Sequence, residues 1–224
     1  MYQPRHFDPD SAEAMYALLR AHPLGLLISP GEDGAPVVDP IPFLLDTGVD
    51  SPQSAQGTLV GHVARANPLW RLADGREVLV VFKGPDAYVS PGWYPAKAEH
   101  GKVVPTWNYA VVQAHGRLRA FDDAQAARRV VSRLTRLHES RRATPWALED
   151  APADYAAKML QAIVAIEVVL TGLDGKFKLS QNRSAEDRAG VVDGLRDAAA
   201  GQPAAPGDPA AVARWMAALP GAPG

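Results

Sequence analysis

The sequence predicts a mainly β fold of the α+β class, with helices at its periphery. Between about residues 24 and 121, apolar and β-branched runs alternate with short turns rich in Gly, Pro and Asp. Strands at this close spacing are typical of a barrel or a sandwich. Helical periodicity, with apolar residues three and four positions apart, is found mainly before and after this region.

A short helix is expected first, beginning after the capping residues at 8–11 and ending at Pro23. Six strand segments are then expected between turns at 30–34, 46–56 and 74–75. They are residues 24–29, 37–45, 57–64, 77–82, 87–90 and 104–121. Pro40 and Pro42 interrupt the second segment, and because proline has no N–H, that strand is expected at a sheet edge or a bulge.

The remaining third of the chain predicts further helices and one more strand. Asp122 and Asp123 cap a helix whose apolar stripe is expected at Val130, Val131, Leu134, Leu137 and His138. A shorter helix over 155–163, a strand over 163–170 and a helix starting at Ser184 follow.

The chain ends in a linker and a helix. Residues 198–211 are rich in Ala, Pro and Gly and predict a linker. Apolar residues at helical spacing then predict a docking helix, for example onto a partner subunit; they are Val212, Trp215, Met216 and Leu219. We therefore expect residues 1–196 to form the domain and 197–224 a linker with a C-terminal helix.

The composition excludes several classes of site and partner. The 224 residues carry a formal net charge of -2 and a pI of about 6.3, so DNA binding is possible but receives no support from charge. The chain has no cysteine, which excludes disulfides, thiolate nucleophiles and Cys-ligated zinc. No signal peptide core is visible, and no stretch approaches the roughly 18 apolar residues of a membrane helix. A cytoplasmic location without a membrane partner is therefore expected.

The common catalytic motifs do not occur. There is no G-x-G-x-x-G, and the glycines at 172–176 are too close together for a phosphate loop. Ser90 lacks the first glycine of a nucleophile elbow, because Tyr88 takes its place. The six histidines never pair at i, i+4. Hydrolase and metalloenzyme functions are thus weakly supported.

Three clusters have the chemistry of a binding site. In residues 61–70 a strand runs into a turn with Arg65, Asn67 and the helix-starting Pro68, which suits a phosphate; a capped turn with a solvated Arg is the structural alternative. Residues 84–94 and 104–109 concentrate aromatic and hydrogen-bonding side chains, which suits a ring system; a barrel core with a stiff loop is the alternative. Residues 175–183 place Lys176 and Lys178 on one face of a strand, which suits an anion; a solvated edge strand is the alternative.

These clusters, together with the opening residues 1–7, closely resemble the PaiB family, whose members are described as FMN-binding negative transcriptional regulators. The resemblance covers roughly residues 1–196 in order, through the segments 62–70, 84–94, 104–109 and 176–182. It implies a split β-barrel of the pyridoxamine-phosphate-oxidase type. It also implies a homodimer with flavin mononucleotide (FMN) in a cleft near the subunit interface.

Carried over residue by residue, the resemblance implies three parts of an FMN site. The phosphate side is His62, Ala64, Arg65 and Asn67. The ring side is Thr106, Trp107 and Asn108. A C-terminal contribution, from the same or the other subunit, is Lys178, Ser180 and Gln181.

The sequence leaves three functions open. The first is a flavin-binding transcriptional regulator or sensor, for which the arginine-rich helix near residue 130 is a candidate DNA surface, although a solvated helix face is the more common arrangement. The second is an FMN-dependent oxidoreductase acting on a small molecule, with His62 or Tyr109 as candidates for proton transfer. The third is a non-catalytic dimeric module with a vestigial flavin site.

Overall fold

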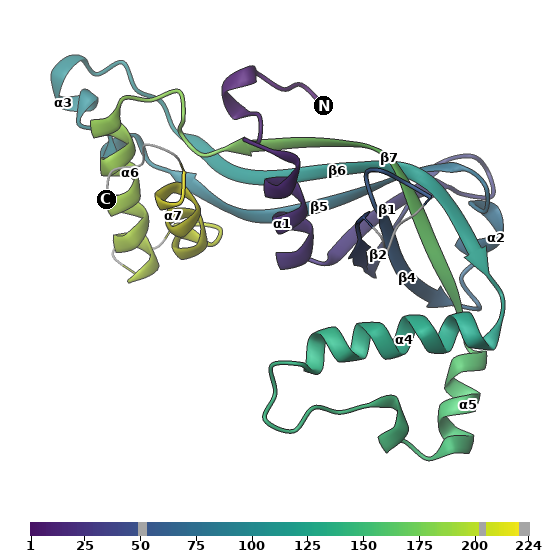
Figure 1. The fold of residues 1–224 in the computed structure, drawn as a ribbon. Coiled ribbons are helices and arrows are strands. Elements are labelled where there is room, and N and C mark those ends of the chain that lie inside the picture. Colours follow the sequence, from purple (N-terminus) through teal and green to yellow (C-terminus); the bar gives the residue numbers. More distant parts are fainter. Residues whose placement is uncertain (49–52, 202–204, 220–224) are drawn as a thin grey trace. The chain divides into compact units, whose positions relative to one another are not determined.

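The computed structural model describes residues 1–48, 53–201 and 205–219 (Figure 1). Seven strands form one sheet in the order β2-β1-β5-β6-β7-β4-β3, and the strand pairs of known register are antiparallel. The strands are β1 Leu24–Pro30, β2 Pro36–Pro42, β3 Leu44–Asp46, β4 Thr58–Ala64, β5 Glu77–Val89, β6 Thr106–Phe121 and β7 Ile163–Lys178. The predicted class, mainly β with peripheral helices, is confirmed.

Ten helical segments accompany these strands in the described part of the chain. The α-helices are α1 Ala12–Ala21, α2 Leu69–Leu72, α3 Ala96–His100, α4 Ala124–Glu139, α5 Ala153–Gln161, α6 Ala185–Ala199 and α7 Pro209–Ala217. The 3-10 helices are η1 Arg5–Phe7, η3 Pro91–Trp93 and η4 Leu148–Asp150.

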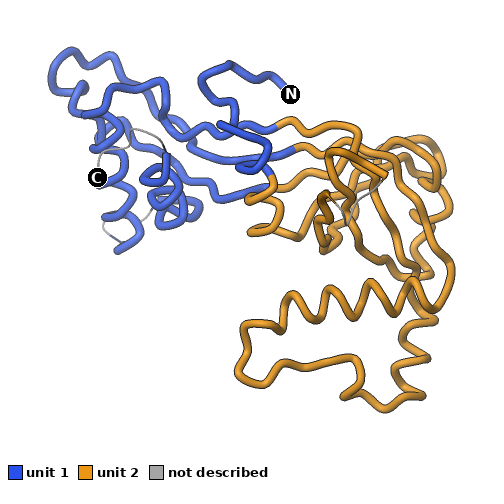
Figure 2. Tube along the Cα trace, viewed as in Figure 1, with its two compact units in different colours: residues 1–15, 83–112, 175–224 blue, residues 16–82, 113–174 orange. Residues whose placement is uncertain are grey.

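The chain divides into two compact units (Figure 2). Unit 1 comprises residues 1–15, 83–112 and 175–224, and unit 2 comprises residues 16–82 and 113–174. The strands β5, β6 and β7 each contribute residues to both units. The predicted site residues are divided between the two units.

In unit 2, prolines determine how the first hairpin is arranged. β2 pairs with β1 from Leu24 opposite Pro42 to Pro30 opposite Pro36, and β2 is the first strand of the sheet order. Its edge position was predicted from its prolines and is confirmed. The predicted strand 37–45 is two strands, because β2 ends at Pro42 and the Phe43 N–H donates to the Pro23 carbonyl (2.9 Å). Residues 49–52 of the predicted turn 46–56 lie outside the described residues.

Two strands are longer than the segments predicted from the sequence. The predicted strands 77–82 and 87–90 are the single strand β5, which continues through the sequence Gly84-Pro85-Asp86. The predicted strand 163–170 continues as β7 to Lys178. Pairing within a sheet can outweigh local turn propensity, which is why Gly and Asp did not end these strands. As a result, Lys176 and Lys178 lie on the last residues of a long strand.

Helix α4 covers part of the sheet in unit 2. The Asp123 side chain accepts a hydrogen bond from the Ala126 N–H (2.7 Å), which confirms the predicted cap. Its buried residues Ala126, Val130 and Leu134 pack against side chains of β3, β4 and β7, namely Leu44, Val60 and Ala165. The predicted stripe was wrong at its end, because Leu137 is 49% exposed and His138 is exposed. The packing against the sheet ends one turn earlier than the periodicity suggested.

In unit 1 the C-terminal helices pack against each other. Val191 and Leu195 of α6 and Val212 and Met216 of α7 are buried. The helix predicted in the tail is therefore confirmed, and it docks on its own chain. The segment before it pairs with β5, since the Asp208 N–H donates to the Asp86 carbonyl (2.7 Å). Residues 202–204 of the predicted linker lie outside the described residues.

We expect Gly194→Ala to destabilise the protein. A Cβ at Gly194 of α6 would lie 2.3 Å from the indole ring of Trp93. Alanine normally favours a helix over glycine by about 1 kcal/mol, but overpacking a filled core costs about 1–3 kcal/mol. Urea unfolding of wild type and variant measures the difference.

The matched control is Gly172→Ala, where a Cβ would have no neighbour within 4 Å. The control should leave the unfolding midpoint nearly unchanged. A Gly194→Ala protein with a midpoint equal to or above that of wild type would show that Trp93 does not pack as described.

Candidate functional site

The ten predicted site residues fall into two groups. Four belong to unit 2, namely His62, Ala64, Arg65 and Asn67, and six belong to unit 1, namely Thr106, Trp107, Asn108, Lys178, Ser180 and Gln181. The two groups have different surroundings.

Arg65 ties the end of β4 to the end of α5. Its Nε donates to the Gln161 carbonyl (2.5 Å) and its Nη2 to the Ile163 carbonyl (3.2 Å). Its Nη1 forms an ion pair with Asp122 (2.6 Å). Carbonyls at the end of a helix attract a cation, which explains this geometry. All three guanidinium nitrogens therefore already have acceptors within unit 2.

Asn67 holds the turn that follows. Its Oδ1 accepts the Leu69 N–H (2.9 Å) at the start of α2, and its Nδ2 donates to Asp39 Oδ1 (2.7 Å). The other Asp39 oxygen is buried without a partner among the described residues. A pocket of about 430 Å³ lies beside this pair, and its ionisable lining is acidic, with Glu32, Asp33 and Asp39. Its charge disfavours a phosphate there.

His62 is a packed residue of β4, paired across the strands with Ala165 of β7. Burial lowers the pKa of His62. Its Nδ1 is buried and has no hydrogen-bond partner among the described residues, which is consistent with a neutral ring. Ala64, two residues on, is exposed at the end of the strand.

In unit 1, Lys178 joins the end of β7 to the start of β6. Its Nζ donates to Thr106 Oγ1 (2.5 Å) and to the Trp107 carbonyl (2.5 Å). Burial lowers the pKa of Lys178, and the positive charges of Lys176 and Arg183 lower it further. The predicted ring-side and C-terminal residues therefore meet through direct hydrogen bonds.

Lys176 is the most deeply buried cation of this region, with 9% of its surface exposed. Its Nζ donates to the Tyr2 carbonyl (3.2 Å) and lies 5.5 to 5.9 Å from the ring centroids of Tyr2, Phe7 and Tyr109. Arg183 lies over the ring of Tyr94 at 4.8 Å. Lys176, Lys178 and Arg183 are called the cationic cluster below.

No carboxylate within the described ranges forms an ion pair with the cationic cluster. Cation–π contacts and carbonyl groups compensate a buried ammonium only in part. The cluster therefore has the charge and the free donors to receive an anion. The residue-by-residue prediction omitted Lys176, Arg183, Tyr2 and Phe7 from the site. The sequence did carry a signal for Lys176, because strand alternation places it on one face with Lys178. Tyr2 and Phe7 lie in the matched residues 1–7, and Arg183 lies in the cluster 175–183.

Asn108 and Ser180 form a buried pair beside the cationic cluster. Asn108 Nδ2 donates to Ser180 Oγ (3.0 Å), and the Ser180 hydroxyl donates to Asn108 Oδ1 (3.2 Å). Ser180 has a φ of 65°, the one positive value of a non-glycine residue among those described. Such a conformation is strained and is retained where the surroundings determine it. Met216 of α7 contacts Asn108 through its sulfur (3.3 Å).

Gln181 stabilises the turn after β7. Its Oε1 accepts the Leu179 N–H (2.7 Å), and its Nε2 donates to the Phe177 carbonyl (2.5 Å). It also lines a cavity of about 160 Å³ in unit 1 together with His6 and Arg188. Gln181 therefore shapes the backbone around Lys178 and Ser180.

A family described as "Putative FMN-binding domain" matches residues 1–172. The chain belongs to this family. A family relative from Bacillus subtilis, the "Protease synthase and sporulation protein PAI 2", is 28% identical, with 88% of this chain and 90% of the relative covered. The resemblance to the PaiB family is thereby confirmed.

One further relative is similar in sequence, and two solved structures share the fold. An uncharacterized protein of Emericella nidulans is 34% identical, covering 80% of this chain and 84% of that protein. The FAD and heme binding protein from Mycobacterium smegmatis shares the fold with a TM-score of 0.56 at 21% identity, covering 81% of this chain and 78% of that chain. The flavocytochrome Anf3 from Azotobacter vinelandii has a TM-score of 0.54 at 16% identity, with 79% and 72% covered. The expected split-barrel class is confirmed.

The family match does not extend over the whole candidate site. The family match ends at residue 172, so the cationic cluster, α6 and α7 lie beyond it. Of the helices in the described part of the chain, none combines the length and the apolar character that crossing a bilayer requires.

We expect His62→Gln to flatten the acid side of the stability profile. Because burial lowers the pKa of His62 below its ordinary 6.5, the unfolded chain takes up the proton first as the pH falls below 6.5. The wild-type free energy of unfolding should therefore fall between pH 6.5 and the lower folded-state pKa, whereas this component is missing in the variant. Urea titrations at a series of pH values measure it.

His138→Gln, at an exposed histidine of α4, is the control and should retain the wild-type slope. Parallel stability profiles for His62→Gln and wild type would contradict the buried neutral imidazole.

Proposed function

We propose that this protein binds FMN and that the cationic cluster of unit 1 receives the cofactor's negative charge. The observation that carries the proposal is a set of three neighbouring cations without a carboxylate partner in the described residues, one of them 9% exposed. FMN offers a phosphate dianion and a flavin edge that becomes negative on reduction. Either group would supply the charge that the cluster lacks, and family membership favours this ligand.

Other residues of unit 1 suit the remaining parts of FMN. Trp107 exposes 41% of its surface and has the ring of Tyr88 at its edge, 6.2 Å between centroids. Such a surface can pack against the flavin ring, while Thr106 orients the ammonium of Lys178. Bound FMN would supply the electron-transfer chemistry, and these residues would bind and orient it.

The four residues predicted for the phosphate side lie in unit 2, where Arg65 already has other partners. Three of the five N–H groups of the Arg65 guanidinium already have acceptors, so a phosphate there would have the two remaining ones and would lie beside the carboxylate of Asp122. The assignment of His62, Ala64, Arg65 and Asn67 to the phosphate side remains a prediction, and Arg65→Ala tests it. If Arg65 binds phosphate, this variant should weaken FMN binding more than Arg133→Ala does.

We propose further that the protein is a homodimer. On one face of unit 2, Leu24, Leu26 and Val38 are 61%, 41% and 52% exposed. The register places Leu26 opposite Pro40 and Ile28 opposite Val38, so these side chains share one face of the β1–β2 hairpin. Exposed apolar faces of this kind mark association sites. The prolines of β2 prevent edge-to-edge pairing, which favours a second copy packing on the face.

For the cellular role, we propose a flavin-dependent regulator or sensor of the PaiB type. The name of the Bacillus subtilis relative, which refers to protease synthase and sporulation, supports regulation. The arginines of α4 give little support to DNA contact. Arg128 pairs with Glu149 (3.5 Å), and Arg133 pairs with Asp46. The overall charge of -2 points the same way.

An FMN-dependent oxidoreductase is the second candidate. The flavin- and haem-binding proteins that share the fold favour redox chemistry. Purified protein with bound FMN can separate the candidates. Bleaching of the flavin absorbance by NAD(P)H, reversed by a small-molecule acceptor, would favour the enzyme, and an unreactive flavin would favour the sensor.

We expect Lys178→Ala to weaken FMN binding by tenfold or more, because it removes about 1.4 kcal/mol or more of charge-assisted interaction. Purified apoprotein is titrated with FMN and followed by quenching of flavin fluorescence. Visible absorbance after desalting gives the stoichiometry.

Lys97→Ala on α3, at an exposed lysine of unit 1, should bind FMN like wild type. Lys178→Arg, which keeps the charge, should recover much of the affinity and so distinguishes charge from misfolding. Equal affinities for Lys178→Ala and Lys97→Ala would overturn the role of the cluster.

We expect Leu26→Glu to shift the protein from dimer to monomer, because a carboxylate on the apolar face would be desolvated in the interface. Light scattering after size-exclusion chromatography measures the mass. Val104→Glu introduces the same charge at a residue of unit 1 that is 63% exposed, and it should remain dimeric. A Leu26→Glu protein of wild-type mass would exclude this face as the interface.

A further inference from the structure

A second pocket in unit 2, of about 290 Å³, lies between helix α4 and the segment that follows it. One wall is a single helix face, because Ser132, Thr135, Arg136 and Glu139 are spaced i, i+3, i+4 and i+7. The other wall is Ser140 and residues 145–149. Figure 1 shows the chain leaving α4, turning back and running to α5. The pocket uses no residue of the proposed FMN site.

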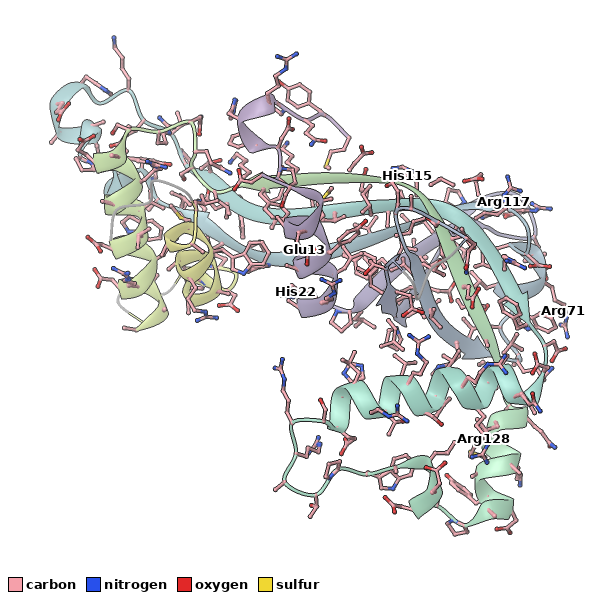
Figure 3. The ribbon with its side chains drawn as sticks, viewed as in Figure 1. Glu13, His22, Arg71, His115, Arg117 and Arg128 are labelled. Atoms are coloured by element: carbon pink, nitrogen blue, oxygen red, sulfur yellow. The ribbon has the colours of Figure 1, made fainter. Side chains whose placement is uncertain are left out.

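The returning segment is anchored at several points. Leu148 is buried in a small core with Ala127, Ala156 and Leu160. The Trp146 N–H donates to Glu139 Oε2 (3.1 Å). Arg128, labelled in Figure 3, extends from α4 to Glu149 (3.5 Å). The segment that forms the second wall of the pocket is therefore held against α4 by packing, a hydrogen bond and an ion pair.

Among the described charged residues that line the pocket, both glutamates have partners, whereas Arg136 has no carboxylate partner. Glu139 accepts the Arg142 Nε–H (2.9 Å) as well as the Trp146 N–H, so both of its oxygens have donors. Glu149 is paired with Arg128. Arg136 is exposed and has no carboxylate partner within the described residues. Ser132 and Thr135 place hydroxyl groups on the same helix face, so Arg136 and these hydroxyls are suited to one carboxylate.

The opposite wall of the pocket includes the rings of a tryptophan and a proline. Trp146 is 45% exposed, and Pro145 precedes it. An indole with an exposed face favours an aromatic ring stacked on it. A volume of 290 Å³ is at the lower end for small-molecule sites, which usually hold about 300–1,000 Å³.

We propose that this pocket binds a small aromatic monocarboxylate. The carboxylate pairs with the guanidinium of Arg136 and the hydroxyls of Ser132 and Thr135, and the ring packs against Trp146 and Pro145. Such a ligand would bind to unit 2 at residues separate from the proposed FMN site.

Benzoate is the probe, titrated into the full-length protein as purified and followed by isothermal calorimetry and by tryptophan fluorescence. For nine heavy atoms, we expect saturable binding with a Kd of about 1 mM. Arg136→Gln should weaken it at least tenfold, and benzamide, which has the same shape without the charge, should also bind at least tenfold more weakly. Trp146→Leu should weaken binding and remove the fluorescence response.

Arg141→Gln is the matched control, since Arg141 is exposed and does not line the pocket. It should bind benzoate like wild type, and circular dichroism should show that both arginine variants are folded. The proposal is overturned if benzoate binding does not saturate, if Arg136→Gln binds like wild type or if benzamide binds as well as benzoate. FMN content, measured in the same samples, reports separately on the flavin proposal.

Discussion

The burial of positive charge in unit 1, with no carboxylate partner among the described residues, is the constraint on which the proposed site depends. Lys176 is 9% exposed and surrounded by Tyr2, Phe7 and Tyr109, and Lys178 is held by Thr106 and Trp107. Desolvating an ammonium is costly, and aromatic faces and carbonyls offset only part of that cost. An anionic ligand would offset the rest, which is why a flavin phosphate or a reduced flavin edge suits this place.

Two cationic side chains of unit 2, Arg65 and Arg133, differ from the cationic cluster because they form ion pairs with carboxylates. Arg65, which sequence reasoning treated as a phosphate ligand, binds Asp122 and the carbonyls of Gln161 and Ile163. It fastens α5 and the start of β7 to β4. Arg133 is similarly joined to Asp46. In unit 2 these two arginines are joined to carboxylates, whereas the cationic cluster of unit 1 has no carboxylate partner among the described residues.

The sheet gives these features their positions. Prolines make β2 an edge strand, and the apolar face of the β1–β2 hairpin is the surface that we propose for association. The α4 helix packs one face on the sheet through Val130 and Leu134 and presents another to the segment 140–149. The same helix therefore covers part of the core and forms one wall of the pocket proposed for a carboxylate ligand.

The sequence by itself determined the β-rich class, the capped α4, the edge position of β2 and the amphipathic C-terminal helix, because periodicity, caps and prolines act over a few residues. It also placed Thr106, Asn108, Lys178 and Ser180 in matched segments. The structure joins Asn108 to Ser180 and Lys178 to Thr106 by hydrogen bonds. Only the tertiary structure decided which cations are paired, that β5 and β7 continue through turn-like segments and that Leu137 is exposed. The partners of Arg65 lie 57 to 98 residues away along the chain. Contacts of that range depend on the folded arrangement and leave no local pattern.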